Sequence, residues 1–135
     1  MSVILIRAAL ETALNSITPA MATSWENYSY APVAGVPYQA INLLFVQPEN
    51  PTFGSAFHRE VGYMQVTLNY PLQVGPTTAA TRAELIRAKF FRGASFTSGG
   101  VTVVIHRTPE ISSGRVDGDR WAVPVKVFFY SDILS

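Results

Sequence analysis

The first candidates for metal binding or catalysis lie in "SSGRVDGDRW", residues 112–121, which holds two aspartates and two arginines. Asp117-Gly118-Asp119 is the one close pair of acids in the sequence and therefore the first candidate for a metal site. A calcium loop of the helix-loop-helix type would continue with glycine at its sixth position and glutamate at its twelfth. Ala122 and Phe128 stand there instead, which excludes that loop. Asp-Gly is also a common turn between strands, so we expect a turn, with a weak ion site as the lesser alternative.

Serine and histidine chemistry has little support. The segment "GASFT", residues 93–97, begins like the G-x-S-x-G elbow of hydrolases, but Thr97 replaces the second glycine. The segment also follows a predicted helix, whereas the elbow follows a strand. A catalytic triad of Ser95, His106 and Asp119 can be a chance combination, because a serine, a histidine and an acidic residue occur in almost any chain. We therefore predict no enzyme activity, no catalytic residue, no cofactor and no metal. The minor alternative is a small metal-dependent hydrolase, built around His106, Glu110, Asp117 and Asp119.

Basic residues gather on the predicted second helix. They border its apolar stripe, where long cationic side chains usually lay their stems over the core and keep their charges in water. We expect such a solvated border, and the alternative is a face that guides passing DNA without reading its sequence. The residues are Arg82, Arg87, Lys89 and Arg92.

Six main elements explain the apolar pattern, together with a short strand over 25–30. Helical spacing predicts helices over 2–17 and 78–91, and alternation or apolar runs predict strands over 38–47, 63–70, 100–107 and 120–130. Residues 48–62, between the first two of these strands, are expected to form a long loop. The fold class is therefore α+β, a single domain over 1–135 with the order α-β-β-α-β-β. We expect a mostly antiparallel sheet with two helices packed on one face.

The same periodicities predict which side chains are buried. The first helix has one apolar face for the core, whereas Ile4 and Leu5 point elsewhere, which predicts either a helix buried on two sides or a second apolar strip for another subunit. Strand 38–47 is apolar on both sides, which predicts a central strand covered on both faces. Pro124 predicts a sheet edge or a bulge in strand 120–130. The core residues expected from the two helices and two alternating strands are Val3, Ile6, Leu10, Ala13, Leu14, Ile17, Met64, Val66, Leu68, Tyr70, Ala79, Ala83, Ile86, Phe90, Trp121, Val123, Val125, Val127 and Phe129.

Composition favours association over catalysis. Charged residues make up 14% of the 135 residues, against about 25% in ordinary soluble domains, while the hydrophobic fraction is 48%. A surface so poor in charge predicts neutral or apolar patches that a partner covers, although a surface rich in Ser, Thr, Asn and Gln would be the alternative. The net charge of +1 gives no general attraction to nucleic acid or membranes, and the absence of cysteine excludes disulfides. The start of the chain predicts neither a signal peptide nor a membrane span.

The segment order and the turn positions resemble those of the tail terminator-like proteins of long-tailed bacteriophages, which are related in fold to the lambda-type tail terminator. Three stretches carry the resemblance, and none is a chemical motif. They are "IRAALETAL" at 6–14, "QPENPTFGSAFHREVGYMQVTLNYP" at 47–71 and "GGVTVVIHRTPEISSGRVDGDRWAVPVKVFFY" at 99–130.

The resemblance implies a structural virion protein that closes into a ring, with six as the expected number of subunits, on the last ring of the tail tube. Such a ring ends tube polymerisation, meets the head-tail connector proteins and leaves a channel through which DNA passes without specific contacts. It would belong to the neck end of the virion tail and reside in the host cytoplasm during assembly, with no membrane partner. A head-tail adaptor or tail completion subunit remains the alternative.

The resemblance implies that Phe53, Phe57, His58 and Arg59 are subunit or tube contacts, with Phe53 and Phe57 pinning the loop to its own sheet as the alternative. It also implies that Arg115, Asp117, Asp119 and Arg120 form a charged cluster that pairs within its loop or across to a neighbouring subunit. Ile4 and Leu5, from the helix pattern, complete the expected interface residues.

Overall fold

The computed structural model describes residues 2–27, 29–50, 57–73 and 75–134. Within these ranges the helices are α1 (Ser2–Asn15) and α2 (Thr77–Lys89). The strands are β1 (Ala22–Ser24), β2 (Tyr38–Phe45), β3 (Phe57–Pro71), β4 (Ser95–Ser98), β5 (Val101–Ile105), β6 (Glu110–Ile111), β7 (Arg115–Asp117) and β8 (Arg120–Leu134).

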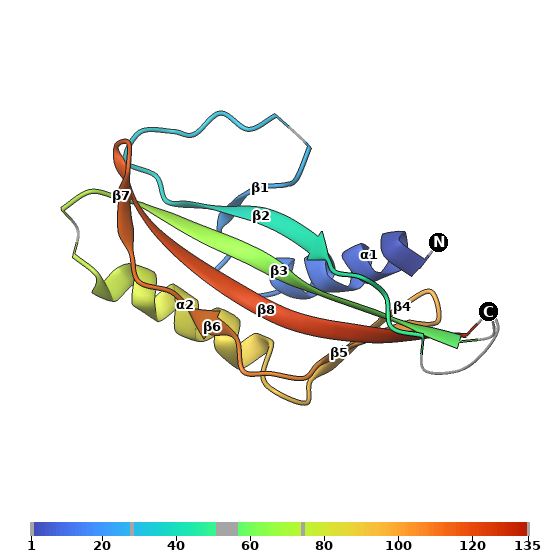
Figure 1. Ribbon diagram of the computed structural model, residues 1–135. Coiled ribbons are helices and arrows are strands. Elements are labelled where there is room, and N and C mark those ends of the chain that lie inside the picture. The colour runs from blue at the N-terminus through green and yellow to red at the C-terminus, as the bar shows by residue number, and fades with distance from the viewer. Residues whose placement is uncertain (1, 28, 51–56, 74, 135) are drawn as a thin grey trace.

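These strands form one sheet in an α+β fold, with the order β1-β2-β3-β8-β5-β4 (Figure 1). β1 runs parallel to β2, and the other pairings among the described strands are antiparallel. β6 and β7 also pair with β8, so three short strands share the edge of β8 that faces away from β3. The expected strand at 25–30 is wrong, because β1 ends at Ser24. The expected element order also lacked β1, β4, β6 and β7.

The long strands β3 and β8 form the centre of the sheet and pair over their whole length, from Phe57 with Leu134 to Pro71 with Arg120. The long loop expected over 48–62 is therefore wrong for its second half, where residues 57–62 extend β3. Glu49 adds an isolated bridge to Arg59. Such cross-strand pairing gives this polar stretch its partners, which the apolar pattern alone does not reveal.

A single core contains residues of both helices and of the sheet, and the predicted inward residues form most of it. Ile6 and Leu10 of α1 share this core with Ile86 of α2, and each is fully buried. Val3 is the clear exception, because 44% of it is exposed. Trp121 is only partly buried at the margin of the core. The residues at the centre of the sheet that were expected inside, and are buried, are Met64, Val66, Leu68, Tyr70, Val123, Val125, Val127 and Phe129.

β2 is covered on one face only, so the expectation of a strand buried on both faces is wrong. Ile41 and Leu43 enter the core, whereas Asn42 and Leu44 alternate to the opposite face and are exposed. β2 does lie inside the sheet, between β1 and β3. Its apolar Leu44 therefore lies on a surface, where 44% of the residue is accessible.

Pro124 lies in the middle of the sheet, so the expected edge position is wrong. Its register with Thr67 of β3 is uninterrupted, and the irregularity falls on the other neighbour of β8. There β6 ends at Ile111, β7 begins at Arg115, and residues 112–114 stand opposite only Val123 and Pro124. The Ser112 amide donates to the Pro124 carbonyl at 2.9 Å. Because proline has no N–H to return, the ladder is interrupted at this point.

No helix in the described part of the chain is long and apolar enough to cross a membrane.

Candidate functional site

The face of the sheet opposite the core carries a row of apolar side chains. Tyr63 of β3 and Phe128 of β8 are register partners, and their ring centroids are 5.7 Å apart. Leu44 of β2 stands opposite Tyr63 on its other side. These residues share a face because directly paired residues of neighbouring strands point the same way. We call this surface, formed by Leu44, Tyr63, Lys126, Phe128 and Tyr130, the outer sheet face.

Cations lie directly over the aromatic rings of the outer sheet face. The Arg107 guanidinium is 4.2 Å from the Phe128 ring centroid, and the Lys126 ammonium is 5.2 Å from that of Tyr63. A ring face attracts a cation through its quadrupole, so each ring holds its charge in place. Among the residues that the structure describes, neither Arg107 nor Lys126 forms an ion pair. Sequence reasoning missed Arg107, because its position over Phe128 depends on tertiary packing.

His106 is next to this cluster, with its ring 5.5 Å from that of Tyr130. Burial lowers the pKa of His106, and the positive charges of Arg107 and Arg59 lower it further. The imidazole is therefore neutral at neutral pH and contributes no charge to the outer sheet face. His58, the other histidine, has Nε2 3.4 Å from Oε1 of Glu60.

The predicted contact residues from α1 and β3 differ in accessibility. Ile4 is 64% exposed, whereas Leu5 is partly buried against the backbone of Gly99. Phe57 is partly buried and begins β3. Arg59 is bound within the subunit by Asp132. Phe53, the remaining aromatic prediction of this group, lies outside the described residues.

The hairpin of β7 and β8 confirms the predicted turn. Asp117 pairs with Arg120, and only Gly118 and Asp119 lie between them. Gly118 has φ +62°, a conformation that glycine adopts with little strain. Arg115, Asp117 and Asp119 are exposed and form no ion pair within the described part of the chain. The hairpin therefore presents two carboxylates at its tip.

Arg120 does not join this exposed group, because only 5% of it is accessible. Its two terminal nitrogens donate to the carbonyls of Val36 at 2.6 Å and Val33 at 2.8 Å. The guanidinium also lies 5.1 Å from the ring centroid of Tyr38. Arg120 therefore ties the segment before β2 to β8, and the expected pairing with the aspartates of its own loop is absent from the described ion pairs. Only tertiary structure brings these carbonyls to it.

The residues suggested for a hydrolase do not converge. His106 contacts Tyr130, whereas Asp119 adjoins Arg120. Tyr130 and Arg120 are separated by about 33 Å along β8 at the usual rise of a strand. The described residues contain no group of three or more potential metal ligands. The fold therefore does not bring together the triad or the set of residues suggested for a metal-dependent hydrolase.

The basic residues of α2 do not form a continuous charged face. Arg82 is only 5% exposed and donates to the carbonyl of Pro19, so its expected solvated position is wrong. Burial lowers its pKa. Arg87 donates from two nitrogens to the carbonyl of Pro109, at 3.2 and 3.0 Å. Lys89 is partly buried, and Arg92 is exposed. The candidate DNA face is thereby reduced to these last two residues.

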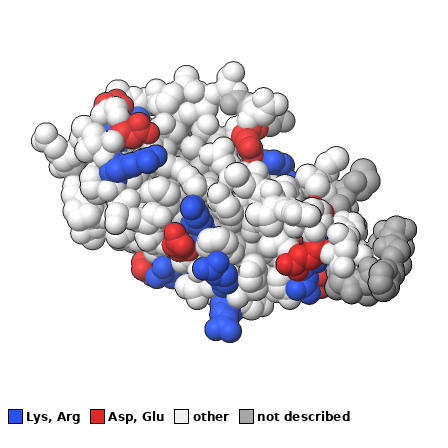
Figure 2. Space-filling model, viewed as in Figure 1, with Lys and Arg blue, Asp and Glu red and all other residues white. Residues whose placement is uncertain are grey.

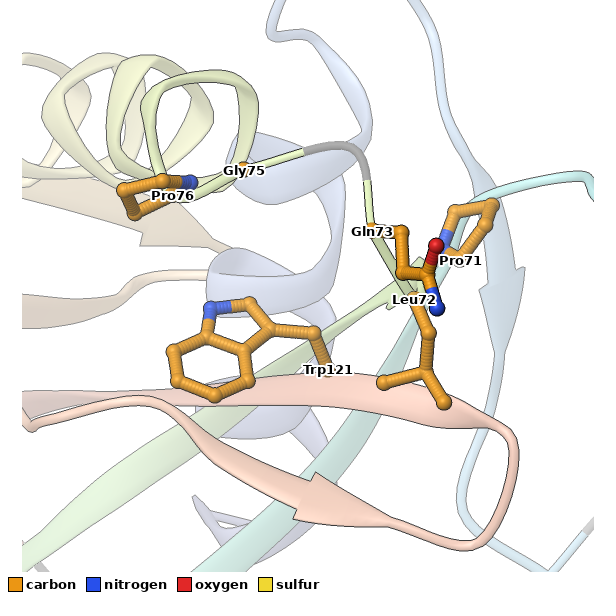
Figure 3. Close-up of a pocket in the computed structure, with 6 residues that line it drawn as sticks. All are labelled: Pro71, Leu72, Gln73, Gly75, Pro76 and Trp121. Carbon is orange, nitrogen blue, oxygen red and sulfur yellow. The ribbon is translucent and has the colours of Figure 1, made fainter.

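A pocket of about 270 Å³ lies where the end of β3, the start of α2 and the start of β8 meet (Figure 3). Its described lining is mostly apolar, with the Trp121 indole as one wall and Leu72 as another. Gln73 is the only described lining residue with a polar side chain apart from the indole N–H. The pocket therefore holds no acid, base or nucleophile among these residues and gives no support to catalysis.

Broad uncharged areas dominate the view of the molecule in Figure 2, and charged side chains stand in separate small groups. The expectation of a surface poor in charge and rich in apolar groups is met by exposed large hydrophobic residues on several elements. They are Val3, Ile4, Val33, Val36, Leu44, Val46, Leu72, Phe91 and Val116.

Comparisons with known proteins agree with this picture of an assembly subunit. The family model of the phage tail terminator protein matches residues 5–129. A solved structure that carries no functional name superposes with a TM-score of 0.77 at 23% identity, over 100% of this chain and 98% of the other. That likeness shows the fold alone. No curated protein matches the chain. The family match covers most of the sequence, and the chain therefore belongs to the phage tail terminator protein family.

Proposed function

We propose that this protein closes into a ring, with six subunits as the expected number, on the last ring of the phage tail tube. The ring ends tube polymerisation and offers its free side to the head-tail connector proteins. DNA passes through the ring without specific contacts. Membership of the tail terminator family supports a structural role in tail assembly.

One observation supports ring formation: exposed apolar side chains lie both on the α1 side of the molecule and on the outer sheet face. Ile4 projects from α1, which packs against β4 and β5 on the core side of the sheet. Leu44, which is exposed, lies on the opposite, outer sheet face beside the partly exposed Tyr63 and Phe128. A head-to-tail contact between identical subunits needs two different patches, and such a contact closes into a ring when the rotation allows. Two separate patches on opposite sides meet that requirement.

The experiment combines the purified protein with its tail tube protein during tube assembly. Negative-stain microscopy and native mass spectrometry should find a closed ring with a central hole, and tubes that stop growing when the protein binds one end. A protein that stays monomeric beside unaffected, growing tubes would contradict the proposal. A ring that binds the connector but leaves tube growth unchanged would identify an adaptor or completion subunit instead.

A matched pair of variants makes the test specific. Leu44→Glu places a charge on the outer sheet face, at a residue that is 44% exposed, so folding should be retained while ring formation is lost. Leu72→Glu changes a residue that is exposed to a similar degree, 39%, in the turn after β3 and serves as the control. Unfolding monitored by circular dichroism should show similar stability for both variants.

A further inference from the structure

The hairpin of β7 and β8 presents negative charge at one end of the molecule. Asp117 and Asp119 are exposed, and the turn between their strands lies at the left end of β8 in Figure 1. Figure 2 shows acidic side chains at that end. Arg115 is also on the hairpin, so the tip keeps a net charge of −1 from these three residues. We call Asp117-Gly118-Asp119 the acidic tip.

Two positive charges that have no carboxylate partner among the described residues lie over the later part of β8. Arg107 and Lys126 are held over the rings of Phe128 and Tyr63. Glu110 is the register partner of Lys126, yet no ion pair between them is among those of the described residues. Arg107 is exposed and Lys126 is partly exposed, so both are accessible to a carboxylate of another chain, and charge-assisted hydrogen bonds of this kind are strong. We call Arg107 and Lys126 the basic clasp.

We propose that the acidic tip of one subunit docks on the basic clasp of the next copy in the ring. Arg120, beside the tip, and Phe128, beneath Arg107, are eight residues apart on one strand, about 26 Å at the usual rise. The two groups therefore cannot meet within one chain. They are complementary in charge, and both belong to this chain, so a second copy supplies the partner of each. The contact is head-to-tail, and the inference rests on the ring proposed above.

Cysteine cross-linking tests the contact directly, because the sequence contains no cysteine that could give a background reaction. Val116→Cys places a thiol beside the acidic tip, and Thr108→Cys places one beside Arg107, so all four proposed charges remain. Both parent residues are exposed. A short bis-maleimide should link a mixture of the two single variants into dimers and the double variant into a ladder of covalent multimers. Neither single variant alone should form dimers.

The matched control replaces Thr108→Cys by Ala88→Cys, a substitution at an exposed position on α2. This variant should not cross-link to Val116→Cys. Dimers of Val116→Cys alone would indicate a two-fold symmetric contact and would overturn the inference. A wild-type ring whose Val116→Cys and Thr108→Cys chains do not link would also overturn it.

An exchange of charges gives an independent test. In the variant Arg107→Glu/Lys126→Glu, both the tip and the clasp are acidic. In the variant Asp117→Lys/Asp119→Lys, both are basic. Each variant alone should lose at least tenfold in ring affinity, while their mixture should form rings in which the two alternate. The control Lys89→Glu/Arg92→Glu changes net charge as much as the first variant and should form rings like wild type. Rings from each reversed variant alone would overturn the inference.

Failure of this inference is distinguishable from failure of the proposed function. Wild-type rings that cap tubes, with reversed variants that do the same, would leave the proposed function intact and remove only the tip-to-clasp contact. A wild-type protein that remains monomeric beside growing tubes would remove both.

Discussion

Arg59 and Asp132 form a two-pronged ion pair between neighbouring strands: Nε donates to one carboxylate oxygen at 2.7 Å and a terminal nitrogen donates to the other at 3.2 Å. They are register partners of β3 and β8. The bond to Asp132 raises the pKa of Arg59. The same guanidinium lies 4.2 Å from the ring centroid of Tyr130. This one cation therefore fastens the end of the strand pair and covers part of the outer sheet face.

The Arg59–Asp132 pair should contribute little to stability, because its side chains are 36% and 39% exposed. Arg59→Ala should lower the free energy of unfolding by less than about 1 kcal/mol. Chemical denaturation at low salt and at about 1 M salt should show this difference shrinking as salt screens the pair. A loss of several times that size, independent of salt, would contradict this account.

Arg120 should contribute much more to the stability of the fold than Arg115, the exposed arginine of the same hairpin. Arg120→Ala leaves the carbonyls of Val33 and Val36 without their charged donor, and we expect a loss of about 3 kcal/mol in the free energy of unfolding. Limited proteolysis should also cut the segment around residues 31–37 sooner. Arg115→Ala, which removes an exposed arginine from the same hairpin, is the control and should change stability by less than about 0.5 kcal/mol. Equal effects of the two substitutions on stability would contradict the proposed role of Arg120 in holding Val33 and Val36 against β8.

Gly62 allows β2 and β3 to approach closely. A Cβ atom at this position would stand 2.1 Å from the backbone oxygen of Leu44, which cannot move without breaking the pairing of the strands. Gly62→Ala should therefore cost about 3 kcal/mol or more in stability. Gly118→Ala is the comparison, since open space surrounds it and only its φ of +62° opposes a side chain. It should cost about 1 kcal/mol in thermal or chemical unfolding, and a reversed order would be inconsistent with the strand contact.

Glu26 links α1 to β2, because one carboxylate oxygen accepts from Arg7 at 2.8 Å and from the Leu43 amide at 3.0 Å. Burial alone would raise the pKa of Glu26, but the bonds from Arg7 and Leu43 outweigh it and the pKa is lowered. A carboxyl with a lowered pKa stabilises the fold above its unfolded pKa, near 4.5, and loses that effect as pH falls through the folded value.

Glu26→Gln should therefore be less stable than wild type at neutral pH, and the difference should shrink as the pH is lowered below about 4.5. Urea titrations from pH 7 to pH 3 measure this trend. Glu84→Gln removes a carboxylate with 66% side-chain exposure and provides the control. A stability difference that grows on acidification would rule out the Glu26 link.

The sequence predicted the centre of this fold because long elements repeat their periodicity several times. Alternation from Met64 to Tyr70 and from Val123 to Phe129 identified the buried face of both central strands. Short strands could not be predicted in the same way, since β6 has only two residues and depends on β8 for its pairing. The extension of β3 through residues 57–62 was hidden by charged residues whose partners lie about 70 positions away, as with Arg59 and Asp132.

The candidate site was harder to predict than the fold. Arg82 and Arg120 look like surface charges in the sequence, yet each is buried because a distant backbone carbonyl accepts from it. Arg107 gave no signal, since its ring partner is 21 residues away. Periodicity identifies a face of an element, whereas such contacts depend on which segments the topology brings together.

The length of β8 has a consequence for the size of the assembly. The acidic tip immediately precedes its first residue and its later residues carry one half of the basic clasp, so the length of the strand sets the distance between the two ends of the proposed contact. Each subunit would then advance the ring by a fixed step of about 26 Å, eight residues at the usual rise. Two residues added to both β3 and β8 would lengthen that step by about 7 Å and keep every side chain on its original face. The diameter of the channel would be encoded in the number of residues of a single strand.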